Sequence, residues 1–225
     1  MNIQPPEKQQ PAHSDRSVEV HSIFQTIQGE GPFTGHRATF IRLAGCNLQC
    51  PGCDTYYTAG RTRRTPEQIL AQVPSLPALV VITGGEPFRQ GIYGLVEALL
   101  EAGHHVQIET NGTLFQDLPF DKITIVCSPK GTKVHPKLQP HITALKYVLR
   151  AGNGGEDGLP ITALNLPING RLARPWPSFT GLVYLQPEDE KNQAANRNNI
   201  AAVVNSVLEF GYVLQLQVHK FVNVE

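Results

Sequence analysis

Apolar residues recur along the chain in short blocks, and the pattern within each block predicts a strand or a helix. RATFIRLAG (residues 37–45) alternates apolar and polar positions, which predicts a first strand. ALVVIT (78–83) is a continuous apolar run, as expected of a strand covered on both faces. Further strands are predicted at HHVQIET (104–110), KITIVCS (122–128), ALKYVLR (144–150), GLVYLQP (181–187) and YVLQLQVHK (212–220).

Three segments between these strands have features typical of helices. TPEQILAQV (65–73) begins with Thr65 as N-cap and Pro66 at the first helical position. YGLVEALLEAG (93–103) and NIAAVVNSVLEFG (199–211) repeat apolar residues at helical spacing. Their predicted apolar faces comprise Leu95, Val96, Leu99 and Leu100 in the first, and Ile200, Val203, Val204, Val207 and Leu208 in the second. Gly103 suits the C-terminal cap of the first.

Strands that alternate with helices pair in parallel through right-handed crossovers. The middle of the chain has too few helices for a full eight-fold barrel. The pattern therefore predicts an α/β fold, a single-domain partial TIM-type barrel of about six parallel strands with fewer helices. Chemistry in such folds gathers at the carboxyl ends of the strands. Residues 151–178, rich in Gly and Pro, predict a long loop that lies at the surface or forms a lid.

Composition narrows the class of protein. The 225 residues are 40% hydrophobic and 17% charged, and the 19 basic side chains balance the 19 acidic ones. Such neutrality gives no field that attracts nucleic acid or an acidic membrane, and no apolar run is long enough to span a bilayer. Residues 1–17 lack the apolar core of a secretion signal and predict a flexible tail before a domain at 18–225. Three crowded cysteines out of four do not resemble a disulfide framework, which points to a reducing cytoplasm.

The crowded thiols are Cys46, Cys50 and Cys53. A structural zinc site needs a fourth ligand, and the remaining thiol, Cys127, lies inside an apolar run where packing is the expected role. A [4Fe–4S] cluster can be held at three corners by a short loop, leaving one iron open to another ligand. The spacing favours the cluster, with zinc or uncoordinated thiols as the alternatives.

This Cys-x-x-x-Cys-x-x-Cys spacing resembles that of the radical S-adenosylmethionine (SAM) enzymes. TGGEP (residues 83–87) is similar to their glycine-rich segment, where absent side chains let the backbone approach the ammonium of SAM. The resemblance implies that SAM binds the open iron and is cleaved to a 5′-deoxyadenosyl radical.

A narrower resemblance covers nearly all of residues 20–225. FQTIQGEGPFTG (24–35), FIRLAGC, CDT, TGGEP, ETNGT, SPK, LQP and LQVHKFVNV occur in this order. Together they resemble the 7-carboxy-7-deazaguanine synthases. That resemblance implies a radical ring contraction of 6-carboxy-5,6,7,8-tetrahydropterin with loss of ammonia, in the biosynthesis of queuosine and related deazapurines. The radical would remove the hydrogen at C6 and SAM would be regenerated, so SAM is expected to act as a catalytic cofactor.

The resemblance also implies roles for individual residues. Substrate binding falls to Ile27, Gln28, Gly29, Glu30, Arg42, Thr83, His219 and the terminal Glu225, with Arg42 on the substrate carboxylate. The residues that the resemblance implies for SAM binding are Gly85, Glu109, Ser128, Pro129, Lys130, Gln186, Pro187, Glu188 and Asp189. Glu109 could instead hold a pterin nitrogen. Two of these residues also have an interpretation without a function. Glu109 would then be an ordinary carboxylate in a turn, and His219 would be a hydrogen-bonded histidine of the core.

The same resemblance implies a magnesium ion bound by Thr55, a flavodoxin- or ferredoxin-like reductant and a homodimer. No side chain is expected to act as a nucleophile. Two other functions share some of these features. A glycyl-radical activase has the same thiol spacing but acts on a protein backbone, and a zinc-binding interaction module has no catalytic activity.

Overall fold

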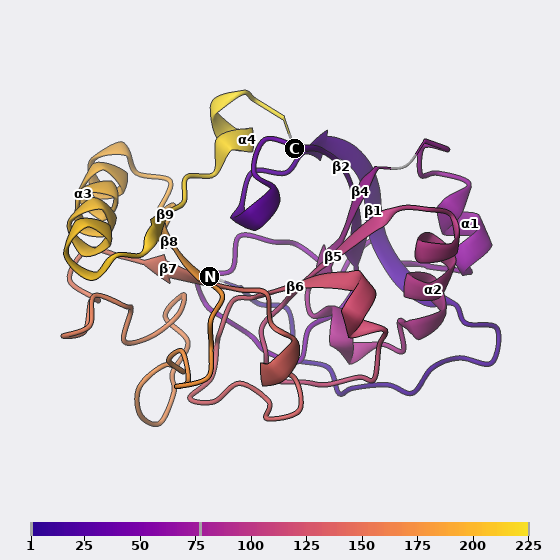
Figure 1. The fold of residues 1–225 in the computed structure, drawn as a ribbon, viewed down its shortest axis with the longest axis horizontal. Helices are drawn as coiled ribbons and strands as arrows, with labels where there is room; N and C mark the ends of the chain where they lie inside the picture. Colours follow the sequence, from indigo (N-terminus) through magenta and orange to yellow (C-terminus); the bar gives the residue numbers. More distant parts are fainter. Residues whose placement is uncertain (1, 77, 225) are drawn as a thin grey trace.

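A curved β-sheet organises the chain, as the computed structural model shows for residues 2–76 and 78–224 (Figure 1). The strands within these residues are β1 (Val18–Ile27), β2 (Arg37–Leu43), β3 (Thr62–Arg64), β4 (Leu79–Gly84), β5 (His105–Thr110), β6 (Ile123–Cys127), β7 (Ala144–Leu149), β8 (Leu182–Pro187) and β9 (Val213–Leu214). They form one sheet in the order β3-β1-β2-β4-β5-β6-β7-β8-β9.

From β2 to β9 every neighbouring pair of strands is parallel. The sheet stays open, because β3 and β9 lie at its two ends. The predicted partial barrel is thus confirmed, although β1 pairs antiparallel with both β2 and β3. Strand β1 is not predicted from the sequence, because its register shifts between Val20 and Ser22 and its apolar residues do not alternate regularly.

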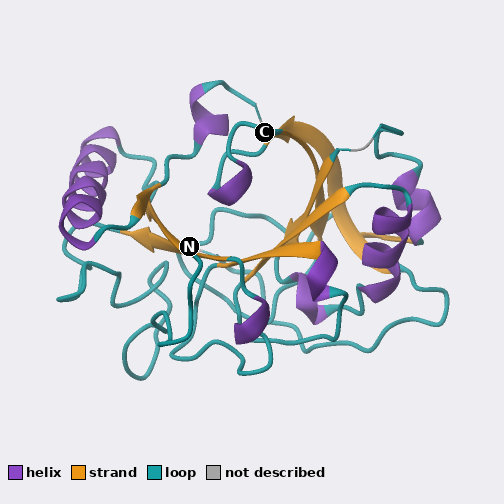
Figure 2. Ribbon diagram, viewed as in Figure 1, coloured by secondary structure: helices purple, strands orange, loops and turns teal. Residues whose placement is uncertain are grey.

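Helices lie mainly on the outer side of the curved sheet (Figure 2). They are α1 (Pro66–Leu70), α2 (Tyr93–Glu101), α3 (Gln193–Phe210) and α4 (Val218–Phe221), with short 3₁₀ turns η1 (Gly31–Phe33), η2 (Pro87–Arg89), η3 (Phe120–Lys122) and η4 (Gln139–His141). No helix in the described part of the chain combines the length and the apolar character needed to cross a bilayer.

Helix α1 and helix α2 start where the sequence predicts, although α1 ends at Leu70, before the end of the predicted segment at Val73. Thr65 caps α1 with a reciprocal pair of hydrogen bonds to Gln68, and Pro66 is the first helical residue. The predicted apolar face of α2 packs in the core, where Leu95, Val96 and Leu99 are fully buried. The strand predicted at 78–83 is also confirmed, since Leu79 to Ile82 are all buried in β4.

Helix α3 differs from its prediction in extent and in the face that it buries. It starts at Gln193, because the Asn192 side chain accepts hydrogen bonds from the backbone N–H groups of Ala194 and Ala195. Val203 is buried, but Leu208 is 80% exposed. Polar groups contribute to the packed face instead: the Ser206 hydroxyl, for example, donates to the Gly158 carbonyl at 2.9 Å.

The predicted last strand, residues 212–220, is mostly wrong. Only Val213–Leu214 form a strand, and the chain then turns into α4. The reason is a competing set of contacts. Gln215 donates to the Gly29 carbonyl at 3.0 Å and accepts from the Gly31 N–H at 2.6 Å, so the segment is drawn across to the turn after β1.

Two segments without helices or long strands also pack on the sheet. Between β7 and β8, the predicted long loop includes one isolated bridge, Gly154 to Pro160, and buries Leu159 and Leu172 in the core. Residues 2–17, where the composition predicts a flexible tail, contain no helix or strand but hydrogen-bond to the loop after β2.

Candidate active site

The loops that follow the parallel strands meet at one edge of the sheet. The loop after β2, residues 46–58, is called the cluster loop here because it contains the three crowded thiols. Asn47 of this loop donates to Thr113 at 2.8 Å and accepts from the Asn111 side chain at 2.9 Å, which joins it to the loop after β5. Gly52 donates to the Leu164 carbonyl at 2.9 Å, which joins it to the long loop before β8.

The thiols of the cluster loop are not engaged in disulfides. Cys46 and Cys50 are buried and Cys53 is half-buried. Burial raises the pKa of the Cys46 thiol to about 12, and it raises the pKa values of Cys50 and Cys53 as well. The Leu48 N–H donates to the Cys46 sulfur at 3.4 Å. Among the described residues, no group of three or more His, Cys, Asp or Glu side chains converges on one point as ligands of a single metal ion would.

Cys127 lies apart from these thiols. It ends β6, is fully buried and belongs to the main hydrophobic core. A Cβ atom on Gly112 would lie 2.6 Å from its sulfur. The expected packing role of Cys127 is therefore confirmed.

The glycines of TGGEP allow the carboxyl end of β4 to contact the carboxyl end of β2. Gly84 has φ +132°, and a Cβ there would lie 2.1 Å from the Leu43 carbonyl oxygen. A Cβ on Gly85 would lie 2.0 Å from the Gly45 oxygen and 2.9 Å from the Cβ of Cys46. Only glycines let this segment press against the start of the cluster loop.

Glu86 fixes the same segment to the next strand. It is fully buried and accepts hydrogen bonds from the Thr110 hydroxyl and the Asn111 N–H, both at 2.7 Å. Burial raises the pKa of this carboxyl. The carboxyl therefore holds the loop after β4 against the end of β5 and the loop that follows it.

A cavity of about 190 Å³ opens between these loops. Of the residues predicted to bind SAM, those that line it are Gly85, Glu109, Ser128, Lys130, Gln186, Glu188 and Asp189, together with Cys53 of the cluster loop. Lys130 donates to the Ser128 hydroxyl at 2.6 Å, and burial lowers the pKa of its ammonium. Pro129 and Pro187, also predicted to bind SAM, do not line this cavity.

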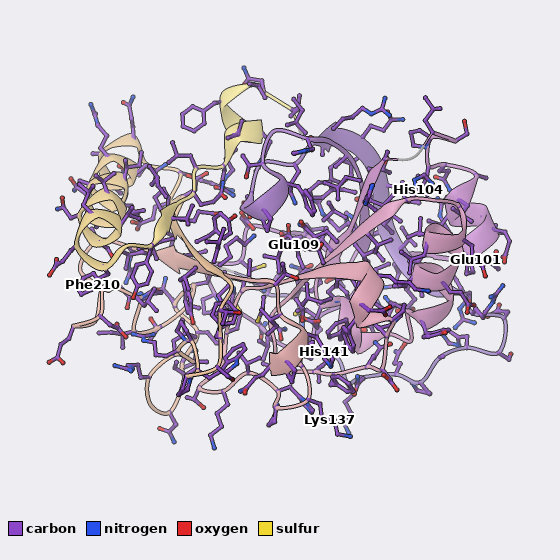
Figure 3. All side chains as sticks on the ribbon, viewed as in Figure 1. Glu101, His104, Glu109, Lys137, His141 and Phe210 are labelled. Carbon is purple, nitrogen blue, oxygen red and sulfur yellow. The ribbon has the colours of Figure 1, made fainter. Side chains whose placement is uncertain are left out.

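A second cavity of similar volume adjoins the first. The predicted substrate residues that line it are Ile27, Gln28, Glu30, Arg42, Thr83 and His219. The two cavities share seven lining residues: Glu30, Asp54, Thr55, Thr83, Glu109, Lys146 and Gln217. Molecules bound in the two cavities would therefore touch. Figure 3 shows Glu109, one of the shared residues, near the centre of the molecule.

A buried ion triad lines both cavities. Lys146, only 8% exposed, forms ion pairs with Glu30 and, at 3.1 Å, with Glu109. Although burial alone would raise it, the Lys146 ammonium lowers the pKa of Glu30 to about 2. Gln28 donates to Glu109 at 3.1 Å and Gln217 donates to Glu30 at 2.7 Å. The Lys146 ammonium and the two side-chain amides thus hold both carboxylates in place.

The C-terminal segment completes the second cavity. A Cβ on Gly29 would lie 1.9 Å from Nδ1 of His219, so the absence of a side chain at Gly29 makes room for this ring. Burial lowers the pKa of His219. Arg42 stacks over the Phe24 ring with 4.9 Å from its guanidinium carbon to the ring centre. Gly29 itself does not line the cavity, and Glu225 lies outside the described residues.

Several lining residues are not predicted from the sequence, above all Lys146 and Gln217. A signal for Lys146 existed: it is a charged residue in the middle of the apolar run ALKYVLR, where a lysine must find carboxylate partners. No comparable signal marks Gln217, since it lies in a segment predicted to be a strand.

The donor set fits an iron–sulfur cluster and SAM. Three thiols without disulfide partners occupy one loop, and the wall beside them is made by glycines where a Cβ would collide. In addition, the Oε1 atom of Gln186 is buried without a hydrogen-bond partner and belongs to a residue that lines the first cavity. A bound molecule with a donor would satisfy it.

Comparisons with known proteins agree with this geometry. Residues 40–124 match the Radical SAM superfamily. The 7-carboxy-7-deazaguanine synthase of Rhodospirillum rubrum is 43% identical over 220 residues, which cover 92% of this chain and 93% of the relative. That of Rickettsia prowazekii is 40% identical, covering 92% and 89%. The crystal structure of QueE from Escherichia coli has the same fold, with TM-score 0.67 and 24% identity over 89% of this chain and 94% of that one.

The fold, the three-thiol loop and the superfamily match define a radical SAM enzyme. Within that class, the chain belongs to the 7-carboxy-7-deazaguanine synthase family. The comparisons do not favour the glycyl-radical activase or the zinc module.

Proposed function

We propose that this enzyme converts 6-carboxy-5,6,7,8-tetrahydropterin into 7-carboxy-7-deazaguanine with loss of ammonia, for queuosine or related deazapurines. One observation carries the proposal. A cavity that reaches the cluster loop adjoins a second, polar cavity, and seven residues line both. Such an arrangement suits a cofactor and a flat polar substrate that must react across a short distance.

Beside the first cavity, which Cys53 lines, Cys46, Cys50 and Cys53 would hold a [4Fe–4S] cluster. When bound, the cluster and SAM would supply the radical chemistry that removes the hydrogen at C6 of the pterin, with SAM as a catalytic cofactor. The chain's part is to orient SAM. Gly85 would let the backbone approach SAM closely, and the unpartnered Gln186 oxygen would accept a hydrogen bond from it.

Lys130 and Ser128 lie together on the same wall and would contact SAM, as would Glu188 and Asp189. Pro129 and Pro187 border these residues in the chain and would shape the loops that carry them.

In the second cavity, Arg42 would bind the carboxylate of the pterin, because its planar guanidinium forms paired hydrogen bonds. Its stacking on Phe24 limits its conformations before the substrate arrives. The fixed carboxylates Glu30 and Glu109 face the same space and would accept hydrogen bonds from pterin N–H groups. His219, with its lowered pKa, would meet the substrate as a neutral ring.

Magnesium is proposed at Thr55. Its hydroxyl donates to the Asp54 carboxylate at 3.2 Å, and both residues line both cavities. Oxygen donors of this kind suit a hard ion that keeps several waters and gains its remaining ligands from the substrate. The ion would stabilise negative charge on the substrate carboxylate next to the radical chemistry.

Further features follow from the family resemblance and are proposed with the function. Residues 18–225 would act as one catalytic domain in the cytoplasm, as a homodimer, with electrons from a flavodoxin- or ferredoxin-like protein. Glu225 is proposed to bind the substrate.

The test is turnover after anaerobic reconstitution with iron and sulfide. With reductant, SAM, magnesium and the carboxypterin, we expect the mass and ultraviolet spectrum of 7-carboxy-7-deazaguanine. Cys50→Ala should abolish both the cluster signal and turnover, while Cys127→Ala, the matched thiol outside the cluster loop, should keep the cluster. Absence of the deazaguanine from a cluster-loaded enzyme would refute the proposed substrate. One 5′-deoxyadenosine per product would refute the catalytic use of SAM.

A further inference from the structure

Residues 2–10 run along the cluster loop and hydrogen-bond to it, and we name them the N-terminal strap. Its backbone bonds to the loop beside two of the thiols. The Glu7 N–H donates to the carbonyl oxygen of Cys46 at 2.7 Å. The Asn2 N–H donates to that of Pro51 at 3.1 Å, one residue after Cys50.

A third attachment lies two residues after Cys53 and is made by one side chain. Gln4, only 6% exposed, donates from Nε2 to the Thr55 carbonyl at 3.0 Å. Its Oε1 accepts from the Tyr57 N–H at 2.7 Å and from the Thr58 hydroxyl at 2.6 Å. Gln4 thereby fixes the backbone of the residue that is proposed to bind magnesium.

Charge strengthens the attachment at the start of the loop. Arg89 is fully buried, and its guanidinium lies between Glu7 at 3.1 Å and Glu19 at 2.8 Å. Arg61 pairs with the same two carboxylates, at 2.7 Å and 3.3 Å. Arg89 also donates to the Ala44 carbonyl at 2.9 Å, just before the first thiol. The strap thus supplies one of the two carboxylates that compensate these two cations.

We propose that the N-terminal strap positions the cluster loop for the iron–sulfur cluster, with Gln4 and Glu7 as positioning residues. This inference rests on the proposed function. A cluster held at three corners leaves the protein only when the loop opens, and a loop anchored beside each thiol opens less often. The strap also lowers the conformational freedom that the loop must lose when the cluster is inserted.

Two readouts test the strap, one without the cluster and one with it. In the cluster-free protein, hydrogen exchange reports on the loop itself. Gln4→Ala should speed exchange of amides in residues 55–58 by about tenfold, because the Tyr57 N–H loses its acceptor, and leave β4 to β6 unchanged. Lys8→Ala, an exposed position of the same strap, is the matched control and should change nothing.

In the reconstituted protein, the rate of iron release to a chelator without oxygen is followed by loss of visible absorbance. We expect Gln4→Ala to release iron about tenfold faster than Lys8→Ala, and deletion of residues 2–10 to release it faster still. Thermal unfolding of each cluster-free variant shows whether the fold is retained. Gln4→Ala avoids the buried cations, so it remains informative where the deletion fails to fold.

Unchanged exchange in Gln4→Ala overturns the proposal, and so does faster exchange with iron release equal to that of Lys8→Ala. A wild-type chain that takes up no cluster refutes the proposed function instead. In that case the exchange experiment still decides whether the strap fixes the loop.

Discussion

Lys146 lines both cavities and is the ion-pair partner of Glu30 and Glu109. Its replacement by methionine would leave these two carboxylates without a cation. Lys146 is 8% exposed, and the side chains of Glu30 and Glu109 are 14% and 18% exposed. Methionine has similar length and no charge. The expected loss therefore comes from electrostatics and not from a cavity.

The lowered pKa of Glu30 gives the size of the stability loss expected for Lys146→Met. A folded-state pKa of about 2 in place of the ordinary 4.5 corresponds to about 3 kcal/mol of stability. Because this pKa is lowered, the contribution is present above pH 4.5 and is lost as the pH falls toward 2. This agrees with the range of about 3–5 kcal/mol for removal of one partner of a buried ion pair. The raised pKa of Lys146 describes the same pair and adds nothing further.

Urea unfolding of the cluster-free protein, followed by circular dichroism, measures the effect. We expect Lys146→Met to lose about 3 kcal/mol of unfolding free energy at pH 7, and the difference from wild type to shrink by about 1 kcal/mol at pH 4. Lys122→Met, at an exposed lysine, is the control. Lys146→Met/Glu109→Gln should recover part of the loss, since one unpaired carboxylate is removed. A loss below about 1 kcal/mol at pH 7 would refute the electrostatic reasoning.

Three further outcomes are expected. Gly85→Ala should weaken SAM binding by at least about tenfold in equilibrium dialysis, because its Cβ would meet the Gly45 oxygen at 2.0 Å; unchanged affinity would contradict the close approach. Gln186→Met removes a buried oxygen without a partner, so the unfolding free energy of the cluster-free protein should equal that of wild type or exceed it by up to about 1 kcal/mol. SAM should bind this variant less tightly. A clear loss of stability would show that the oxygen has a partner. Thr55→Val should raise the magnesium concentration needed for half-maximal turnover about tenfold, and an unchanged requirement would place the ion elsewhere.

Much of the fold was predictable because its signals are local. The apolar run at 78–83 becomes β4, and Thr65 with Pro66 starts α1, since burial on both faces and capping are properties of adjacent residues. The carboxyl ends of the strands carry the polar motifs, so their convergence follows from parallel pairing alone.

The rest depends on contacts between residues far apart in the chain. Residues 212–220 have a strand-like pattern, but bonds from Gln215 to Gly29 and Gly31 override it. The strap's attachment to the cluster loop has no signal in its Pro- and Gln-rich composition, because single polar side chains and backbone groups make it. Lys146 could have been found, since a lysine within an apolar strand needs partners.

Hydrogen bonds join the turn after β1 to the C-terminal segment, and they affect the order in which the molecule folds. Gln215 and Gly31 are 184 positions apart, and Gln217 and Glu30 are 187 apart. Neighbouring parallel strands can pair one after another during synthesis. The hydrogen bonds between the turn after β1 and the C-terminal segment cannot form until almost all of these 225 residues have been synthesised. We therefore expect nascent chains to pair β2, β4, β5 and β6 well before they can retain a pterin.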